Sequence, residues 1–274
     1  MKEFPYPTDA LGRTKTLHVD KLPREELARL NKLLPWQCFT LDAHGRAFGK
    51  PASSTKRNTP QQIPDRRIAE LNRRISLEGV SVLEIGCFEG IHTIALAGYG
   101  ARVTAVDSRI ENVAKTLLRS ACFGCNPLVY KCDVEQPADF AQIAPTDITL
   151  HIGVLYHLSN PVSHLQQILP LTRKAIVLDT HYALPEQADK SYAVNGTAYS
   201  YKHYREGGRS NVFAGMFDHA KWLTLDTLIA LLNEHGFSNI DVAQLREERN
   251  GPRTLIYASR SPLLAPSDQT GKLE

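Results

Sequence analysis

From Val80 onward, short apolar segments alternate with amphipathic segments, and this alternation constrains the fold more than any other feature of the chain. Short apolar runs predict buried strands, and apolar residues at helical spacing predict helices. Strands separated by helices pair in parallel through right-handed crossovers, so we expect an α/β fold with a Rossmann-like sheet. The first predicted strands cover residues 80–85, 102–106, 128–132, 147–152 and 174–178, and the helices cover 90–98, 110–121 and 162–169.

After Thr180 the alternation is interrupted by a segment rich in Tyr, Gly, His and Arg, at about 181–222. We name this segment the cap, because an insertion of this size in a compact domain is often functional. A helix after Thr224 follows, and then come strands over 239–243 and 254–259, joined by a charged loop. The sheet is therefore predicted to have seven strands.

The chain divides into three predicted regions. Residues 1–76 form an N-terminal helical and loop appendage, residues 77–261 the main domain, and residues 262–274 a tail that we expect to be disordered. The appendage has predicted helices over 23–34 and 64–75, with the sequence PWQCF between them. In the main domain, the helix over 110–121 has a stripe that is expected to face the sheet, comprising Ile110, Val113, Ala114, Leu117 and Ala121.

The composition is that of an ordinary globular protein, with 42% apolar and 22% charged residues. A net charge of +3 does not by itself indicate a nucleic-acid binder, and it does not exclude one. No apolar run is long enough to span a bilayer, and the polar N-terminus is unlike a signal peptide. The odd number of cysteines, five, favours reduced thiols and a cytoplasmic location. Cys122 and Cys125 are expected to pack, and no cluster has the spacing of a metal site.

Residues 84–90, with the sequence EIGCFEG, join the first strand of the sheet to its helix, and we name them the glycine loop. Gly86 and Gly90 permit a tight turn beside the free N–H groups of the helix start. A nicotinamide site usually has GxGxxG, but here the middle position is Phe88. The bulk of Phe88 and the acids Glu84 and Glu89 suit a cationic cofactor better than a pyrophosphate.

Two aspartates end the next two strands. Asp107 is placed to accept hydrogen bonds from ribose hydroxyls, and Asp133 to accept one from the amino group of adenine. Aspartate also begins turns, and either residue alone is explained by that role. Together, at successive strand ends after the glycine loop, they favour a nucleoside site.

The segments VLEIGCFEG, RVTAVD, CDV and GVLYHLSNP resemble class I S-adenosylmethionine-dependent methyltransferases, over about residues 80–259. The resemblance implies that Glu84 and Gly86 place the methionine part of the cofactor, that Asp107 holds the ribose, and that Val134 borders the adenine with Asp133. The full set of expected cofactor residues is Glu84, Gly86, Cys87, Gly90, Asp107, Ser108, Asp133, Val134 and Gly153.

Within this family, GVLYHLSNPVSHL and PWQCF resemble the branch that includes the tRNA wobble-uridine carboxymethyltransferase and small-molecule enzymes. The tRNA enzyme has a lysine just after the tryptophan, which meets the extra carboxylate of its carboxylated donor. Here Gln37 follows Trp36, so we expect ordinary S-adenosylmethionine. The segment after the fourth strand also lacks the Asp-Pro-Pro-Tyr type of motif that is found in adenine-directed methyltransferases.

Methyl transfer requires alignment of a nucleophile with the S–CH₃ bond, and a hydroxyl acceptor also benefits from a general base. His157, after the fourth strand, is the first candidate, and His181, after the fifth, is the second; Tyr156 could orient the donor or the acceptor. A structural hydrogen bond is the alternative for His157. The residues expected at the substrate are Trp36, His203, Tyr204 and Arg205.

We therefore expect a methyltransferase for an oxygen or nitrogen atom of a small molecule. The alternative is a tRNA-modifying enzyme, which would use basic residues of the appendage; a solvated helix face explains them equally simply. A domain that binds S-adenosylmethionine without catalysis is a further possibility, and the glycine loop disfavours a nicotinamide dehydrogenase. The basic residues concerned are Lys50, Lys56, Arg57, Arg66, Arg67, Arg73 and Arg74.

Overall fold

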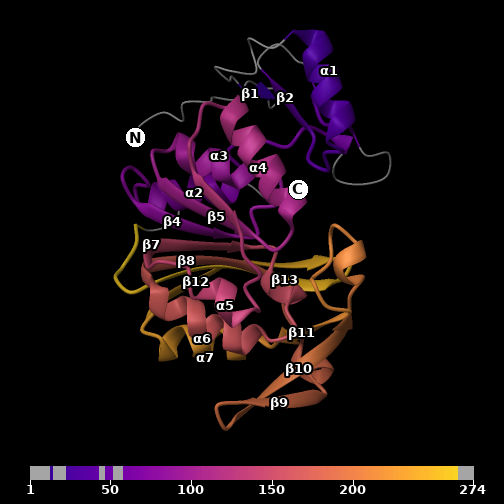
Figure 1. Cartoon of the computed structure of the whole chain (residues 1–274). Helices are drawn as coiled ribbons and strands as arrows, with labels where there is room; N and C mark the ends of the chain where they lie inside the picture. Colours follow the sequence, from indigo (N-terminus) through magenta and orange to yellow (C-terminus); the bar gives the residue numbers. More distant parts are fainter. Residues whose placement is uncertain (1–12, 15–22, 43–46, 52–57, 265–274) are drawn as a thin grey trace.

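The computed structural model describes residues 13–14, 23–42, 47–51 and 58–264. Its centre is a seven-stranded sheet in the order β12-β13-β8-β7-β4-β5-β6 (Figure 1). The pairs from β8 to β6 are parallel, and β13 is antiparallel to both β8 and β12. The predicted Rossmann-like α/β fold is confirmed. The strands are β4 (Ser81–Ile85), β5 (Arg102–Asp107), β6 (Leu128–Lys131), β7 (Thr146–Ile152), β8 (Thr172–His181), β12 (Asn239–Glu248) and β13 (Gly251–Ser259).

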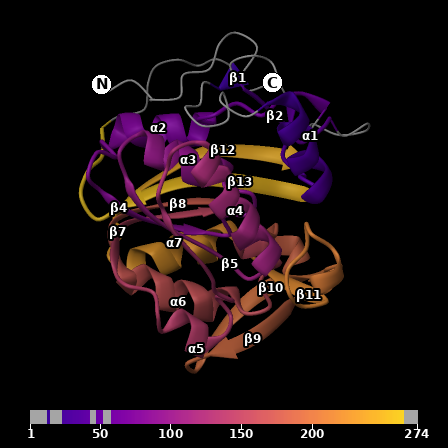
Figure 2. The same cartoon turned by 45° about the horizontal axis from the view of Figure 1, so that its top comes forward.

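Helices cover both faces of this sheet (Figures 1 and 2). One apolar cluster joins one face to α2, α3 and α4, and contains Ile68, Ile94 and Val103. A second cluster joins the other face to α5, α6 and α7, and contains Leu165, Ile176 and Leu228. These helices are α2 (Arg66–Arg74), α3 (Ile91–Gly98), α4 (Ile110–Cys122), α5 (Pro137–Phe140), α6 (Pro161–Leu171) and α7 (Leu225–Glu234).

The appendage packs as part of the same core. Trp36 and Phe48 belong to the cluster that contains Val82 of the sheet. The elements of this region are β1 (Arg13–Thr14), α1 (Arg24–Leu33), β2 (Thr40–Asp42) and β3 (Ala47–Phe48), and the three strands form a small sheet. Most of the tail expected over 262–274, and the basic residues Lys56 and Arg57, lie outside the described residues.

The cap contains a three-stranded antiparallel sheet, which was not predicted. Its strands are β9 (Lys190–Val194), β10 (Thr197–Arg205) and β11 (His219–Leu223). β11 packs against the 3-10 turn Leu155–His157, which follows β7. The cap therefore lies over the carboxyl end of the main sheet, beside the predicted base.

Two predictions of detail are wrong. The charged loop between the last strands is instead a long hairpin, because β12 exposes alternate residues to solvent and so tolerates their charges. In α4, Ile110 is 58% exposed and Leu117 is 47% exposed, although both were expected to face the sheet. The buried face of α4 is instead largely polar, with Lys115, Thr116 and Arg119 among its residues.

Candidate active site

The glycine loop has three residues in the left-handed region. Gly86 has a φ of 72°, Phe88 of 51° and Gly90 of 78°. A Cβ atom on Gly86 would collide with the side chain of Val154, in the loop after β7. The positive φ and the closeness of Val154 explain why glycine is needed at position 86. The tight turn also lets a ligand approach the backbone of the loop closely.

Glu84 lies at the end of β4, with a side chain that is buried. Thr93 donates a hydrogen bond to its Oε2 at 2.5 Å, but Oε1 is buried without a hydrogen-bond partner among the described residues. Burial raises the pKa of Glu84 to about 7. An unpartnered carboxylate oxygen in this place fits the α-ammonium of S-adenosylmethionine, because a cation would supply the missing partner.

Asp107 ends β5 and is almost fully buried. Its Oδ2 accepts from the backbone N–H of Phe88 at 3.0 Å, and its Oδ1 accepts from the N–H of Arg109 at 2.9 Å and from Asn112 at 3.0 Å. These bonds orient the carboxylate and still leave acceptor capacity for a ribose hydroxyl, since a carboxylate has about four lone-pair sites. Ser108 follows directly and is half-buried.

Arg109 connects this edge to the cap. Its guanidinium donates to the carbonyl oxygens of Arg209, Asn211 and Ala214 at 2.7 to 2.9 Å. The ring of Phe88 also lies 5.8 Å from that of Phe213. The cap loop over residues 206–218 is therefore fastened beside the expected ribose site.

The remaining expected cofactor residues lie along the same edge. Gly153 has a φ of 77° and donates its N–H to the Asp179 carbonyl. Asp133 is half-buried and accepts from the N–H of Glu135, as a turn-forming aspartate does, while Val134 is buried beside it. The Cys87 side chain is buried in the core, so only its backbone is available to a cofactor.

Glu89, the second acid of the glycine loop, has a structural role that sequence reasoning missed. Its buried carboxylate accepts from the backbone N–H groups of Gln37 and Cys38 and from the Lys115 ammonium, at 2.7 to 3.0 Å. It therefore holds the appendage and does not contribute to the cofactor site.

Trp36, which was expected at the substrate, is 5% exposed. Its ring lies 4.6 Å from that of Phe48 and beneath the Arg119 guanidinium. This placement makes Trp36 a packing residue of the appendage.

The three predicted catalytic side chains lie together. The ring of Tyr156 is 4.1 Å from that of His157 and 4.7 Å from that of His181. Trp222 of β11 stacks on His181 at 4.8 Å and on Tyr204 of β10 at 4.4 Å. These rings pack against one another where the cap meets the loop after β7, and we name them the aromatic cluster.

The two candidate histidines differ in accessibility. His157 has a side chain that is 19% exposed, and its Nδ1 lies 2.8 Å from Oε1 of Glu206 in the cap. His181 is buried, its Nδ1 is within hydrogen-bond distance of the Pro252 carbonyl, and burial lowers its pKa. His157 is thus the better placed of the two to meet an acceptor.

The three cap residues expected at the substrate lie on opposite faces of β10, because side chains alternate along a strand. Tyr204 faces inward, onto Trp222. His203 and Arg205 are exposed, and the His203 ring instead stacks 5.7 Å from that of His219. Of these three residues, only Tyr204 belongs to the aromatic cluster.

Asp179, at the end of β8, collects three arginines from distant elements. Arg67 and Arg246 donate to it at 2.9 and 3.0 Å, and the Arg253 Nε also donates to it. Burial alone would raise the pKa of Asp179, but the three guanidiniums outweigh it and lower that pKa. Arg253 also lies over the ring of Tyr156 at 5.2 Å. The position of Asp179 at a strand end was the only sequence signal for this cluster.

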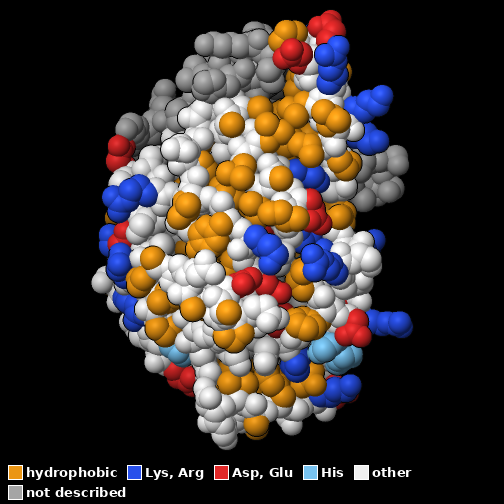
Figure 3. Space-filling model, in the orientation of Figure 1, with side chains coloured by type: hydrophobic (Ala, Val, Ile, Leu, Met, Phe, Trp, Pro, Cys, Tyr) orange, Lys and Arg blue, Asp and Glu red, His pale blue; other side chains and the backbone are white. Residues whose placement is uncertain are grey.

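Several basic residues of the appendage are paired in the same way. Arg73 and Arg74 bind Glu70, Arg74 also binds Asp241, and Arg67 also binds Asp65. On the face shown in Figure 3, basic side chains are interspersed with acidic and apolar ones and form no continuous patch.

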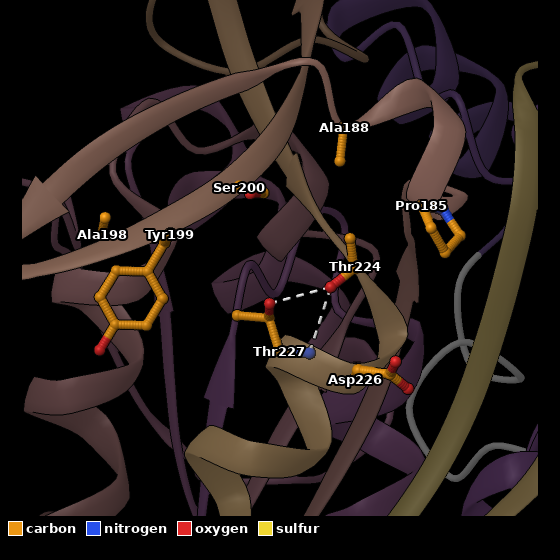
Figure 4. A pocket seen from close by; sticks show the side chains of 8 residues that line it. All are labelled: Pro185, Ala188, Ala198, Tyr199, Ser200, Thr224, Asp226 and Thr227. Carbon is orange, nitrogen blue, oxygen red and sulfur yellow. Dashed lines mark hydrogen bonds between the residues drawn. The ribbon is translucent and has the colours of Figure 1, made fainter.

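A separate cavity of about 340 Å³ lies beside β10 and the start of α7 (Figure 4). Its lining includes Tyr199, Thr224 and Asp226, and Thr224 caps α7 by accepting from the N–H of Thr227. None of its lining residues belongs to the aromatic cluster described above. Among the helices that the structure describes, none is long and apolar enough to cross a membrane.

Comparison with known proteins agrees with this geometry. Residues 46–242 match a family model described as a methyltransferase domain. The N-terminal domain of EvdMO1, solved with S-adenosylhomocysteine, superposes with a TM-score of 0.71 at 27% identity, over 86% of this chain and 96% of that one. The same domain has been solved in the presence of S-adenosylhomocysteine and D-fucose, with a TM-score of 0.70.

Two curated relatives have different named functions. A tRNA U34 carboxymethyltransferase of Saccharophagus degradans is 27% identical over 198 residues, which are 69% of this chain and 55% of that protein. A ubiquinone biosynthesis O-methyltransferase of Xylella fastidiosa is 34% identical over 92 residues, or 31% of this chain and 37% of that protein. The chain thus spans about half or less of these two relatives. With its glycine loop, its strand-end acids and the extent of the family match, the chain belongs to the class I S-adenosylmethionine-dependent methyltransferase family.

Proposed function

We propose that this enzyme transfers a methyl group from S-adenosylmethionine to a hydroxyl oxygen of a small molecule, with His157 as the general base. The observation that carries the proposal is the placement of His157. Its imidazole lies at the end of the strand next to the glycine loop, where the cap packs against the loop after β7, and its side chain is 19% exposed. A hydroxyl that binds beside this imidazole can be aligned with the methyl group while the cap limits the access of water.

The donor side uses the residues at the ends of β4, β5 and β6. Glu84 receives the α-ammonium, Asp107 the ribose hydroxyls, and the Asp133–Val134 pair borders the adenine. S-adenosylmethionine supplies an activated methyl group on a sulfonium, which needs no metal or acid to make it leave. The chain's contribution is therefore to position the reactants and to accept a proton.

The acceptor side uses the aromatic cluster. Tyr156 and Tyr204 present their rings to the acceptor, and Nε2 of His157 takes the hydroxyl proton. The His157 Nε2 has no hydrogen-bond partner among the described residues, so it is available for this role. His181 is buried against Trp222 and supports the aromatic cluster.

Two further observations support an ordinary donor and a small acceptor. Arg253, beside Gly153 and Tyr156, is paired with Glu248 at 3.6 Å as well as with the shared carboxylate of Asp179, so it has acidic partners within the chain before any ligand arrives. The related EvdMO1 domain, matched over nearly its whole length, was crystallised with D-fucose, and the Xylella relative is named an O-methyltransferase. A deoxysugar or a similar polyhydroxylated compound is thus our first choice of acceptor class.

The second candidate is modification of tRNA. It is favoured by the 27% identity to the tRNA U34 carboxymethyltransferase over 69% of this chain. The internal ion pairs of Arg67, Arg73 and Arg74 weigh against it, because paired guanidiniums are less free to release counterions from phosphates.

A labelling assay distinguishes the two functions. The enzyme is incubated with methyl-labelled S-adenosylmethionine and either D-fucose with other 6-deoxyhexoses or total tRNA. We expect label in the sugar fraction, a loss of turnover of at least about 100-fold in His157→Ala, and an unchanged affinity for S-adenosylmethionine. Label in tRNA alone, with a steeply salt-dependent affinity, would instead support the second candidate.

A further inference from the structure

Beside the aromatic cluster lies a carboxylate that the proposed reaction has not yet used. Glu206 directly follows β10 and has a side chain that is only 4% exposed. Its Oε1 lies 2.8 Å from Nδ1 of His157, across the junction between the cap and the loop after β7. A buried acid that contacts one nitrogen of an imidazole constrains what the other nitrogen can do.

Glu206 is itself held on two sides. Its backbone N–H donates to the Asp218 carbonyl at 2.8 Å, and its Oε2 accepts from the N–H of Gly215 at 3.3 Å. The carboxylate therefore cannot turn away from His157 without losing a second bond. Because a carboxylate only accepts hydrogen bonds, the shared proton belongs to Nδ1 of His157.

Gly215 is required for this contact. A Cβ atom at position 215 would collide with the carbonyl oxygen of His157, so only glycine lets the cap loop approach this closely. On its other side the loop is fastened by Arg109, whose guanidinium donates to the Ala214 carbonyl at 2.9 Å. The loop thus places Glu206 against His157 and is anchored two residues beyond Asp107, the expected ribose ligand.

We propose that Glu206 is a positioning residue, which fixes His157 as the Nδ1–H tautomer so that Nε2 faces the acceptor as a base. This inference rests on the proposed function. In the reaction, the acceptor hydroxyl transfers its proton to Nε2, its oxygen forms a bond to the methyl carbon, and the S–CH₃ bond breaks to leave S-adenosylhomocysteine. Glu206 stabilises the imidazolium that results.

The tautomer can be measured without knowing the acceptor. Nitrogen-15 NMR of histidine-labelled enzyme, at about pH 8.5 where imidazoles are neutral, identifies the protonated nitrogen of each ring. The signals of His157 are assigned by their loss in His157→Gln. Glu206→Gln is compared with Glu186→Gln, which changes an exposed glutamate elsewhere in the chain.

We expect the wild type and Glu186→Gln to hold His157 almost entirely as the Nδ1–H form. In Glu206→Gln that share should fall severalfold, while calorimetry gives an affinity for S-adenosylmethionine within about twofold of the wild type, as expected if the donor site is independent of the change. An Nε2–H form in the wild type, or an unchanged tautomer in Glu206→Gln, would overturn the proposal. If Glu206→Gln does not fold, the wild-type spectrum alone still shows which nitrogen of His157 is protonated and so tests the proposal. Neither the NMR measurement nor the calorimetry requires methyl transfer. A failure of the proposed acceptor class is therefore detected separately, by the labelling assay.

Discussion

Thr93 donates a hydrogen bond of 2.5 Å to one carboxylate oxygen of Glu84, and the other oxygen is buried with no partner among the described residues. Burial favours the neutral acid, outweighs the opposing effect of His92, and raises the pKa of Glu84 to about 7. The site therefore contains an acid that is poised to release a proton when an ammonium arrives.

This relationship predicts a pH-dependent affinity for the cofactor. Below about pH 7 the carboxyl must lose its proton before it receives the ammonium, so the Kd for S-adenosylmethionine should rise roughly tenfold for each unit of pH lost. Calorimetry between about pH 5.5 and 7.5 measures this, and buffers of different ionisation enthalpy reveal the released proton. Glu84→Gln should bind more weakly and without this dependence, whereas Glu186→Gln should behave as the wild type. An equal pH dependence in Glu84→Gln would contradict the assignment.

The buried pair of Lys115 and Glu89 predicts a large effect on stability. Their N–O distance is 2.8 Å, with side chains that are 8% and 0% exposed. Lys115→Met leaves the Glu89 charge buried without its cation and should lower the free energy of unfolding by about 3 to 5 kcal/mol. The control is Lys131→Met, since Lys131 forms an exposed pair with Asp139 at 3.6 Å and should contribute about 0 to 1 kcal/mol. Urea denaturation of both variants tests the difference. Equal losses in the free energy of unfolding would show that the buried Glu89 is not stabilised by Lys115.

Two buried histidines predict sensitivity to acid. His151 and His164 face one another with Nε2 atoms 2.9 Å apart, and burial lowers the pKa of His164 to about 4 and that of His151 well below its usual range. In the unfolded chain both would titrate near about 6.5, so below that pH the unfolded state binds more protons and unfolding becomes more favourable.

The contribution of these two histidines to stability should therefore be constant above about pH 6.5 and fall below it, by at most about 1.4 kcal/mol per pH unit for each histidine until the pH reaches the folded-state pKa. Glu84, whose pKa is raised to about 7, adds the opposite slope between about pH 4.5 and 7, and this slope is common to all the variants. The measurement is the urea midpoint at a series of pH values. Replacing both residues with leucine should flatten this curve, while His203→Gln, at an exposed position, should leave its slope unchanged. A double variant that retains the full slope would show that other groups cause the acid sensitivity.

Asp107 gives the most direct test of the donor site by mutation. Asp107→Ala removes a charged acceptor for the ribose hydroxyls and should weaken the binding of S-adenosylmethionine roughly 100-fold, since such bonds each contribute about 1.5 to 3 kcal/mol. Asp226→Ala, at the separate cavity, is the control and should bind normally. Thermal melting without cofactor separates lost affinity from lost folding, because Asp107 also accepts hydrogen bonds from the backbone N–H groups of Phe88 and Arg109. Undiminished affinity in a folded Asp107→Ala protein would remove this residue from the site.

The sequence predicted the main sheet well because its strands are covered on both faces. A doubly covered strand such as β8 contains a continuous run of apolar, buried residues at 175–178, as this arrangement requires. The cap strands were missed because their apolar and polar residues alternate within a segment rich in glycine and charge. The alternation in YSYKHYRE at 199–206 was nevertheless a usable signal, since a period of two places Tyr204 and Glu206 on one face.

The positions of Asp107 and His157 at the carboxyl ends of strands were predictable, because the topology of the sheet alone determines them. The partners of Glu89 and Asp179 could not be predicted, because they are contributed by residues far away in the chain. Gln37 lies 52 residues from Glu89, and Arg67 lies 112 residues from Asp179. The burial of Trp36 has the same cause, since it depends on Arg119 of α4.

The central claim is that the glycine loop edge binds the donor while His157 faces its methyl group. A crystal structure with bound S-adenosylhomocysteine tests this most directly. We predict the ammonium at Glu84, the ribose hydroxyls at Asp107, and the sulfur within about 8 Å of Nε2 of His157, which leaves room for a methyl group and one acceptor oxygen between them. A nucleoside bound away from Asp107, or an Nε2 atom that points away from the sulfur at more than about 12 Å, would contradict the account.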